Sequence, residues 1–346
     1  MKGRVIALDR VDGREAAALM EDGRLQDFLI EPTGEAPPAP GAIFRALCDR
    51  PLKGQGGMMM RLPGGQSGFL RRVKGLSPGQ PLLVQVTGYG EPGKAVPLTA
   101  KVLFKSRYAI VTPEAPGINI SRAIRDEDLR DALLEIAHEA MAGSDFGLIL
   151  RSASADAGEE EIAADISAMR DLAERIMGEA QGSGPEHLLE GPSPHELAWR
   201  EWPMPDILAD APGAFADHGI REALDGFLEG PLPLPGGASM WIEPTRALVA
   251  VDVNTGGDTS PAAGLKANLA AARDLPRALR VLGLGGQITV DFAPMAKKDR
   301  RTLETALRAA FRSDTIETAL VGWTPLGHHE LQRKRERLPI AEHLKI

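Results

Sequence analysis

Two apolar runs that each reach an aspartate decide the fold of this chain and point to its chemistry: Ala247-Leu-Val-Ala-Val-Asp252-Val-Asn254 and Gly286-Gln-Ile-Thr-Val-Asp291-Phe. Both runs have the length and composition of strands. Strand side chains alternate between two faces, so Asp252 and Asn254 are expected to share one face while the flanking valines share the other.

The segment between these runs indicates how they pair. A helical pattern covers residues 265–272, and Pro276 is expected to end or restart that helix. A strand, a helix and a strand in this order usually give a parallel pair, whose ligand crevice lies beyond the carboxyl ends of the strands. We therefore expect Asp252 and Asp291 to lie close together.

Two neighbouring carboxylates suit a hard divalent cation. Mg²⁺ commonly takes one or two carboxylates and keeps several waters for a phosphate substrate, and it makes a bound water easier to ionise. The pair Asp252 and Asp291 thus predicts a magnesium site, where Asn254 orients a carboxylate or a water. The alternative is that each aspartate only caps a turn.

Composition limits the class of protein. The chain has 346 residues, 43% of them hydrophobic, which suits two or three packed units. Its net charge of -8 argues against binding polyanions by bulk electrostatics, although basic residues cluster at residues 297–301 and 333–337. The single cysteine, Cys48, excludes an internal disulfide framework. Without a signal-type or membrane-spanning apolar run, the chain is expected in the cytoplasm, with no membrane partner.

Local patterns divide the first half of the chain. Residues 1–31 read as a short meander with a turn at Asp22-Gly23, and the Pro- and Gly-rich residues 31–41 read as a linker. Short strands separated by Pro-Gly and Gly-Gly turns then predict a small barrel within residues 42–104. An α+β module follows, with strands at residues 108–112 and 146–150 and helices at residues 128–141 and 162–176. Residues 186–235 receive no assignment.

Three segments surround the two aspartates: Val251-Asp252-Val-Asn254-Thr-Gly-Gly, Asn268-Leu-Ala-Ala-Ala and Leu284-Gly-Gly-Gln-Ile-Thr-Val-Asp291-Phe-Ala-Pro-Met. Three more lie upstream: Ser106-Arg-Tyr108-Ala-Ile-Val-Thr-Pro, Ile120-Ser121-Arg122-Ala-Ile and Gly147-Leu-Ile-Leu-Arg151-Ser152-Ala. In this order the segments resemble the ribonuclease E/G family, most closely the ribonuclease G type of catalytic core. The resemblance covers nearly the whole chain and is weakest at residues 186–230.

The resemblance implies an α/β fold (α+β, with several subdomains). Residues 1–37 and 188–228 would form an RNase H-like piece. Residues 38–104 would be an inserted OB-fold barrel that binds RNA, and residues 105–187 a 5′-sensor module. Residues 229–346 would be a DNase I-like catalytic subdomain.

The implied activity is that of a magnesium-dependent endoribonuclease in RNA processing or decay. It would cleave single-stranded RNA, preferably 5′-monophosphorylated, and leave 5′-phosphate and 3′-hydroxyl ends. Asp252 and Asp291 would be catalytic and would hold Mg²⁺, and Asn254 would position Asp291.

Four further residues match RNA-binding positions of the family. Arg151 and Ser152 would bind the 5′-monophosphate, since a guanidinium grips phosphate in a bidentate manner and a hydroxyl adds a donor. Phe69 would stack on a base and Lys94 would contact the backbone, while methionines at residues 58–60 replace a second expected aromatic. Alternatively, Phe69 is a core residue of the barrel and Arg151 a solvated residue that closes a strand.

The sequence also departs from the family pattern. The family often continues into a paired-cysteine segment that shares zinc between two chains. The 346 residues of this sequence contain no such paired-cysteine segment. No zinc-linked dimer is therefore expected, and a homo-oligomer would use other contacts. The adjacent histidines His328 and His329 should have diverging side chains and form a solvated pair, not a metal site.

Three functions remain open from the sequence. The first is the endoribonuclease. The second is an RNA-binding or ribosome-maturation factor on the same scaffold with little or no cleavage, which the altered barrel and a shortened loop at residues 257–268 would fit. The third is a metal-dependent phosphoesterase acting on small molecules, which the barrel disfavours.

Overall fold

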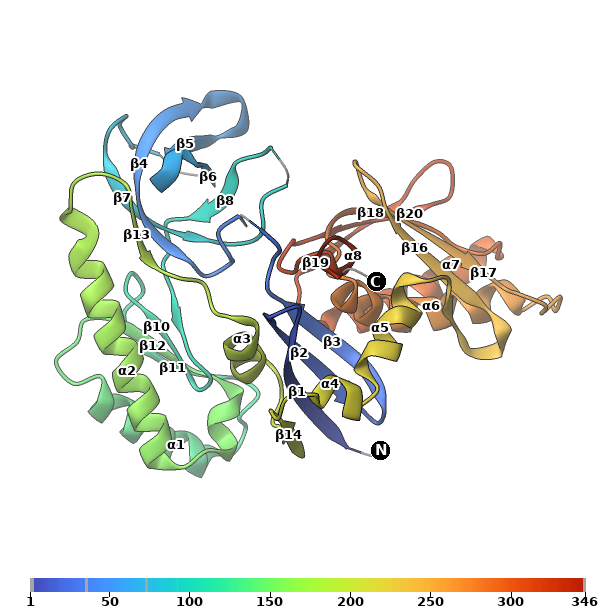
Figure 1. Cartoon of the computed structure of the whole chain (residues 1–346), viewed down its shortest axis with the longest axis horizontal. Helices are drawn as coiled ribbons and strands as arrows, with labels where there is room; N and C mark the ends of the chain where they lie inside the picture. The colour runs from blue at the N-terminus through green and yellow to red at the C-terminus, as the bar shows by residue number, and fades with distance from the viewer. Residues whose placement is uncertain (1–2, 35–36, 72–73, 92, 345–346) are drawn as a thin grey trace. The chain divides into compact units, whose positions relative to one another are not determined.

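The computed structural model describes residues 3–34, 37–71, 74–91 and 93–344, and the chain forms two compact units. One unit combines both ends of the chain, Met1–Glu35 and Met204–Ile346, and the other is the continuous segment Ala36–Pro203. Both units mix strands and helices (Figure 1). In the described ranges no helix is long and apolar enough to cross a membrane.

The N-terminal sheet is a meander held by two Asp-Gly turns. Strands β1 (Arg4–Val11), β2 (Arg14–Glu21) and β3 (Arg24–Ile30) pair antiparallel, and β14 (Ile207–Ala209) pairs parallel with β1. In the second turn φ is 49° at Asp22 and 76° at Gly23. Two successive positive φ angles define the tight hairpin turn that Asp-Gly favours. The predicted meander is confirmed.

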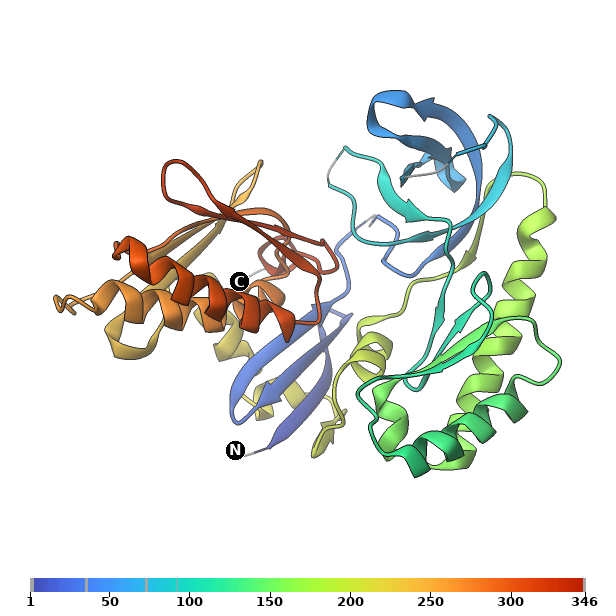
Figure 2. The same ribbon diagram turned by 180° about the vertical axis from the view of Figure 1, so that it is seen from behind.

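A second sheet in the same unit carries the two aspartates. Its strands run in the order β15 (Leu232–Pro233), β16 (Ser239–Pro244), β17 (Val249–Asn254), β18 (Gly286–Asp291), β20 (His329–Arg333) and β19 (Thr318–Trp323). Strands β17 and β18 are parallel, which confirms the predicted pair. Helices α6 (Ala263–Val281) and α7 (Arg300–Arg312) pack together and cover one face of this sheet (Figure 2). The shorter helices of this unit are α4 (Ala214–Asp217), α5 (Ile220–Leu228) and α8 (Ile340–His343).

One apolar core joins the two sheets of this unit. It contains Phe28 of β3, Val251 of β17, Leu275 of α6 and Leu307 of α7. The expectation that Pro276 would end or restart the helix is wrong, because α6 continues through it. A proline inside a helix costs about 3 kcal/mol. Each leucine buried on this helix contributes about 1.5–3 kcal/mol, which offsets that cost.

In the continuous unit the predicted barrel is present and closed. Strands β4 (Ile43–Leu52), β5 (Gly57–Arg61), β6 (Ser67–Arg71), β8 (Val96–Thr99) and β7 (Pro81–Val86) follow one another, and β7 returns to β4. Strands β6 and β8 are parallel, whereas the other barrel pairs are antiparallel. A closed five-stranded barrel of this kind is consistent with an OB-fold.

The rest of this unit is the predicted α+β module. Its sheet runs β11 (Ile118–Ile120), β12 (Gly147–Leu150), β10 (Ala109–Thr112), β9 (Phe104–Lys105), with helices α1 (Glu127–Ala140) and α2 (Glu159–Gly178). Asp126 caps α1 by accepting a hydrogen bond from the Leu129 N–H at 3.0 Å.

Beyond this module the unassigned residues of the sequence are structured. Strand β13 (Glu186–Leu189) pairs with β4, and helix α3 (Pro194–Glu201) begins with a capping box between Ser193 and Glu196. Because the chain separates into two compact units, the finer division into five named subdomains stays a prediction.

Candidate active site

The parallel pair β17 and β18 sets Asp252 directly opposite Asp291. Val251 and Val253 are buried in the core beneath α6, so the alternation of the strand places Asp252 and Asn254 on the other, exposed face. Asp291, the last residue of β18, is exposed on the same face as its cross-strand partner. The structure therefore brings together the two carboxylates that the sequence singled out.

Asn254 contacts Asp252, whereas the resemblance implied that it would position Asp291. Its side-chain Nδ2 donates to Asp252 Oδ2 at 2.8 Å. The two residues are two positions apart on one strand and so point the same way. In this geometry Asn254 orients Asp252, while its expected positioning of Asp291 is not seen.

A histidine that the sequence analysis set aside reaches the acidic pair. His328, just before β20, has its Nε2 3.8 Å from Asp291 Oδ1. The expectation of a solvated histidine pair is wrong. His329 is 2% exposed and packs edge-on against Trp323, with ring centroids 5.2 Å apart. Burial lowers the pKa of His329. The two side chains do diverge, but β20 directs one to Asp291 and the other into the core.

The electrostatics of the pair favour a cation. Like charges directly opposite each other on neighbouring strands are destabilising. In the described part of the chain, no lysine or arginine forms an ion pair with Asp252 or Asp291. The oxygen donors fit the preference of Mg²⁺ for carboxylates. The described ranges contain no cluster of three or more His, Cys, Asp or Glu that could hold a metal. A cation here would therefore depend on water and on substrate oxygens for its other ligands.

On the barrel, Phe69 lies between two residues that point into the core. Gly68 and Leu70 of β6 are buried, and the alternation places Phe69, partly exposed, on the outer face. The Arg71 guanidinium lies 5.9 Å from the centre of its ring, and Met59 is its cross-strand neighbour. This placement disfavours the alternative of a core residue. Lys94, in the loop between β7 and β8, is exposed and forms an ion pair with Glu91.

At the end of β12, Arg151 is held inside the module. Its Nη1 donates to the Ser106 carbonyl at 2.6 Å and to the Arg200 carbonyl at 3.1 Å, and its Nη2 donates to Glu201. Burial works to raise the pKa of Glu201, but Arg151 and Arg200 outweigh it and hold that pKa below its usual range. Ser152, the next residue, is exposed. Arg151 is thus not a solvated strand end, and any phosphate would compete with Glu201 for it.

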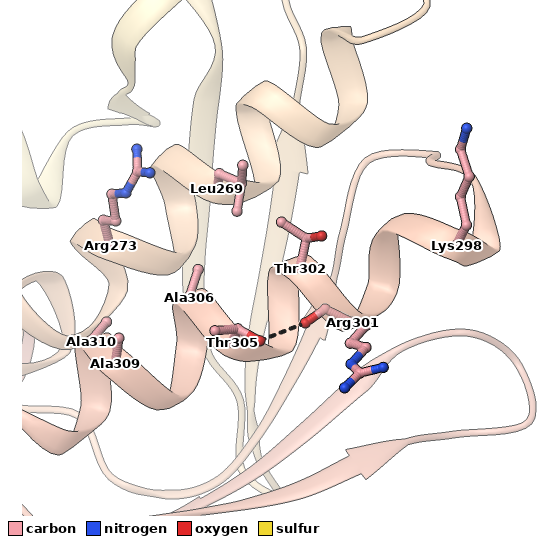
Figure 3. A pocket seen from close by; sticks show the side chains of 9 residues that line it. All are labelled: Leu269, Arg273, Lys298, Arg301, Thr302, Thr305, Ala306, Ala309 and Ala310. Atoms are coloured by element: carbon pink, nitrogen blue, oxygen red, sulfur yellow. Dashed lines mark hydrogen bonds between the residues drawn. The ribbon is translucent and has the colours of Figure 1, made fainter.

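A hollow of about 740 Å³ between α6 and α7 lies apart from the acidic pair. Figure 3 shows its lining: Leu269, Arg273, Lys298, Arg301, Thr302, Thr305, Ala306, Ala309 and Ala310. These residues belong to the helices that cover the far face of the sheet and to the short turn before α7. The hollow is therefore not the space above Asp252 and Asp291.

Comparison with known proteins defines the class. The model of the Ribonuclease E/G family matches residues 104–209 and 206–336. The chain belongs to the ribonuclease E/G family, as its motifs predict.

Three relatives illustrate the extent of the likeness. A ribonuclease E of Nostoc sp. is 29% identical over 311 residues, which are 77% of this chain and 44% of that protein. Ribonuclease G of Escherichia coli (strain K12) is 27% identical over 77% of this chain and 62% of its own length. A chloroplastic ribonuclease E/G-like protein of Arabidopsis thaliana is 26% identical over 75% of this chain and 31% of its length. The chain thus spans about half the length of the bacterial relatives.

Proposed function

We propose that this chain is a magnesium-dependent endoribonuclease that cleaves single-stranded RNA in RNA processing or decay. The observation that carries the proposal is the register that sets Asp252 opposite Asp291 on an exposed sheet face. Family membership adds that similar proteins are named ribonucleases E and G.

Each residue of the proposed site has a distinct task. Asp252 and Asp291 would hold Mg²⁺, which supplies an activated water and offsets charge on a phosphoryl oxygen. Asn254 would orient Asp252 as an oxygen ligand through its 2.8 Å hydrogen bond. The products would carry 5′-phosphate and 3′-hydroxyl ends.

The continuous unit would supply further contacts to RNA. Phe69, on the outer face of the barrel beside Arg71, offers a ring for a base, and Lys94 offers a charge for the backbone. Arg151 and Ser152 would bind a 5′-monophosphate, with the phosphate replacing Glu201 on the guanidinium.

The direct test is cleavage of a labelled single-stranded oligoribonucleotide with and without Mg²⁺. Asp252→Asn and Asp291→Asn should abolish cleavage and leave RNA binding largely intact. Glu243→Gln, an exposed carboxylate on the adjacent β16, is the matched control and should cleave normally. Mass spectrometry of the products reports the end groups. Full cleavage by both aspartate variants would refute the mechanism, and binding without any cleavage by the wild type would support the RNA-binding factor instead.

A further inference from the structure

The exposed face of the sheet that holds the acidic pair carries a row of four side chains, which come from β16, β17, β18 and the residue just before β20. Trp241 of β16 is the cross-strand partner of Asp252, and Asp252 is the partner of Asp291. Val290 pairs with His329 in the antiparallel pair of β18 and β20, so the next position sets His328 beside Asp291. The 3.8 Å separation of His328 Nε2 and Asp291 Oδ1 agrees with that register.

Trp241 is one of two exposed tryptophans among the described residues, together with Trp199. It is 42% exposed, although its neighbour Met240 is fully buried on the other face of the same strand. Trp199 lies under the Arg107 guanidinium and Trp323 packs against aromatic rings, whereas Trp241 has no ring or cation partner among the described residues. Its indole N–H is likewise without a hydrogen-bond partner there. A large flat apolar surface is therefore left open beside the acidic pair.

The two flanks of the acidic pair differ in chemistry. Neighbouring strands lie about 4.8 Å apart, so the indole begins one strand away from Asp252 and the imidazole one strand away from Asp291. An imidazole can donate a hydrogen bond to a phosphate oxygen, but its ring offers less area for stacking than an indole. The β16 flank is therefore the side on which a base can be bound through its flat face.

We propose that Trp241 forms a stacking subsite for the nucleobase next to the phosphate that lies over Asp252 and Asp291. This inference rests on the proposed function, because it takes the acidic pair as the place of the phosphate. Every base has a π-face, so the subsite would accept all four bases, with preference set by stacking strength. It would fix the register of the strand on the sheet, and thereby which phosphodiester is presented to the acids.

The test is a binding cycle that does not depend on cleavage. In the Asp291→Asn background, a single-stranded oligoribonucleotide is compared with a series in which one nucleotide at a time is abasic. One abasic position should weaken binding by roughly 5- to 150-fold, the range for loss of one stacked base. Adding Trp241→Ala should remove that loss at the same position and leave the other positions unchanged.

Two further variants control for misfolding and for changes in RNA affinity that are not specific to one nucleotide position. Trp241→Phe keeps a ring on the strand and should retain most of the position-specific loss. Val321→Ala removes an exposed apolar side chain from β19 of the same sheet and should leave the whole abasic profile unchanged. RNA should also quench the fluorescence of the Asp291→Asn protein more than that of the same protein with Trp241→Phe.

The outcomes separate this inference from the proposed function. An abasic profile that is identical with and without Trp241→Ala would overturn the stacking subsite, even if the wild type cleaves RNA. A position-specific coupling in a wild-type protein that never cleaves would support the subsite and refute the hydrolysis.

Discussion

At the scale of single residues, the sequence predicts where some members of the candidate site lie but not where others lie. Asp252 and Asn254 are placed on one face by alternation alone, and Asp291 follows from the parallel pair. His328 was missed because its approach to Asp291 depends on the antiparallel register of β20, which no local pattern encodes. The partner of Asn254 was assigned from the resemblance, whereas strand geometry favours Asp252, two positions away.

The buried His329 should make the fold sensitive to acid. Burial lowers its pKa in the folded state, while the unfolded chain has the ordinary value of about 6.5. Below pH of about 6.5 the unfolded state takes up a proton that the folded state resists, so stability falls as the pH drops toward the folded pKa. His329→Phe keeps a ring beside Trp323 and removes this titration.

Urea unfolding across pH values from about 5 to 7.5 measures the effect. We expect the free energy of unfolding of His329→Phe to fall less steeply on the acid side than that of the wild type. His343, whose pKa is also lowered by burial, is present in both proteins and cancels in the comparison. Parallel curves for the two proteins would contradict the role given to His329.

At the scale of elements, one buried carboxylate links α6 to β20, the neighbour of β18 in the sheet that carries Asp252 and Asp291. Asp314, after α7, forms ion pairs with Arg280 of α6 and Arg333 of β20, and the side chains of Asp314 and Arg333 are fully buried. Arg333 also donates to Thr318 Oγ1 at 2.8 Å. This cluster holds β20, which pairs with β18, against β19 and α6, and so supports the strand that ends at Asp291.

Arg333→Met should destabilise the protein strongly, because it removes one of the two cations that face a buried carboxylate. Breaking a buried pair in this way costs about 3–5 kcal/mol. Urea unfolding measures the change. Arg312→Met, at the last position of α7, removes an exposed arginine and should change the free energy of unfolding by less than about 0.5 kcal/mol. Equal stability of the two variants would refute the anchoring role.

The ion pair between Arg151, at the end of β12, and Glu201, the last residue of α3, limits how readily the Arg151 guanidinium can bind a phosphate. Glu201→Gln removes the carboxylate from the guanidinium, so we expect a stronger preference for 5′-monophosphorylated over 5′-hydroxyl RNA. Arg151→Ala should abolish the preference, a loss of about tenfold or more for a charged hydrogen bond. The ratio of Kd values for the two RNAs measures it. An unchanged ratio in both variants would exclude Arg151 from phosphate binding.

Element prediction succeeded where a segment carries its own pattern. The helices α1 and α2 and the strands of the barrel follow from periodicity and turn residues, and β17 and β18 from their apolar runs. Helix α6 was predicted to end or restart at Pro276. It continues because its apolar side chains pack in the core, and a rule based on the local sequence does not include this tertiary packing. Helix α3 was left out although Ser193, Pro194 and Glu196 form a capping signal, because the prolines around it suggested a loop.

At the scale of the whole molecule, the chain consists of two units with separate cores. The barrel and the α+β module lie in one continuous segment, while the sheet that carries Asp252 and Asp291 shares its core with the N-terminal meander. Local patterns predicted a boundary near residue 40. Only the resemblance, which joined residues 1–37 with residues 188–228, led to the expectation that a later segment returns to the N-terminal strands, because the pairing of β14 with β1 is long-range.

The continuous unit should fold by itself and bind RNA without cleaving it. A fragment of residues 37–203 is expected to unfold cooperatively and to bind a single-stranded oligoribonucleotide, more weakly than the whole chain. Adding Phe69→Ala should weaken binding by roughly 5- to 150-fold. Circular dichroism and fluorescence anisotropy provide the two measurements, and a fragment that stays unfolded would show that the unit depends on the rest of the chain.

Cation binding by Asp252 and Asp291 is the claim on which the rest depends, and Mn²⁺ titration followed by electron paramagnetic resonance tests it most directly, because Mn²⁺ accepts the same oxygen ligands as Mg²⁺. We predict one bound Mn²⁺ per chain that Mg²⁺ displaces, and loss of this binding in Asp252→Asn and in Asp291→Asn, with Glu243→Gln unchanged. Undiminished Mn²⁺ binding in both aspartate variants would contradict the account.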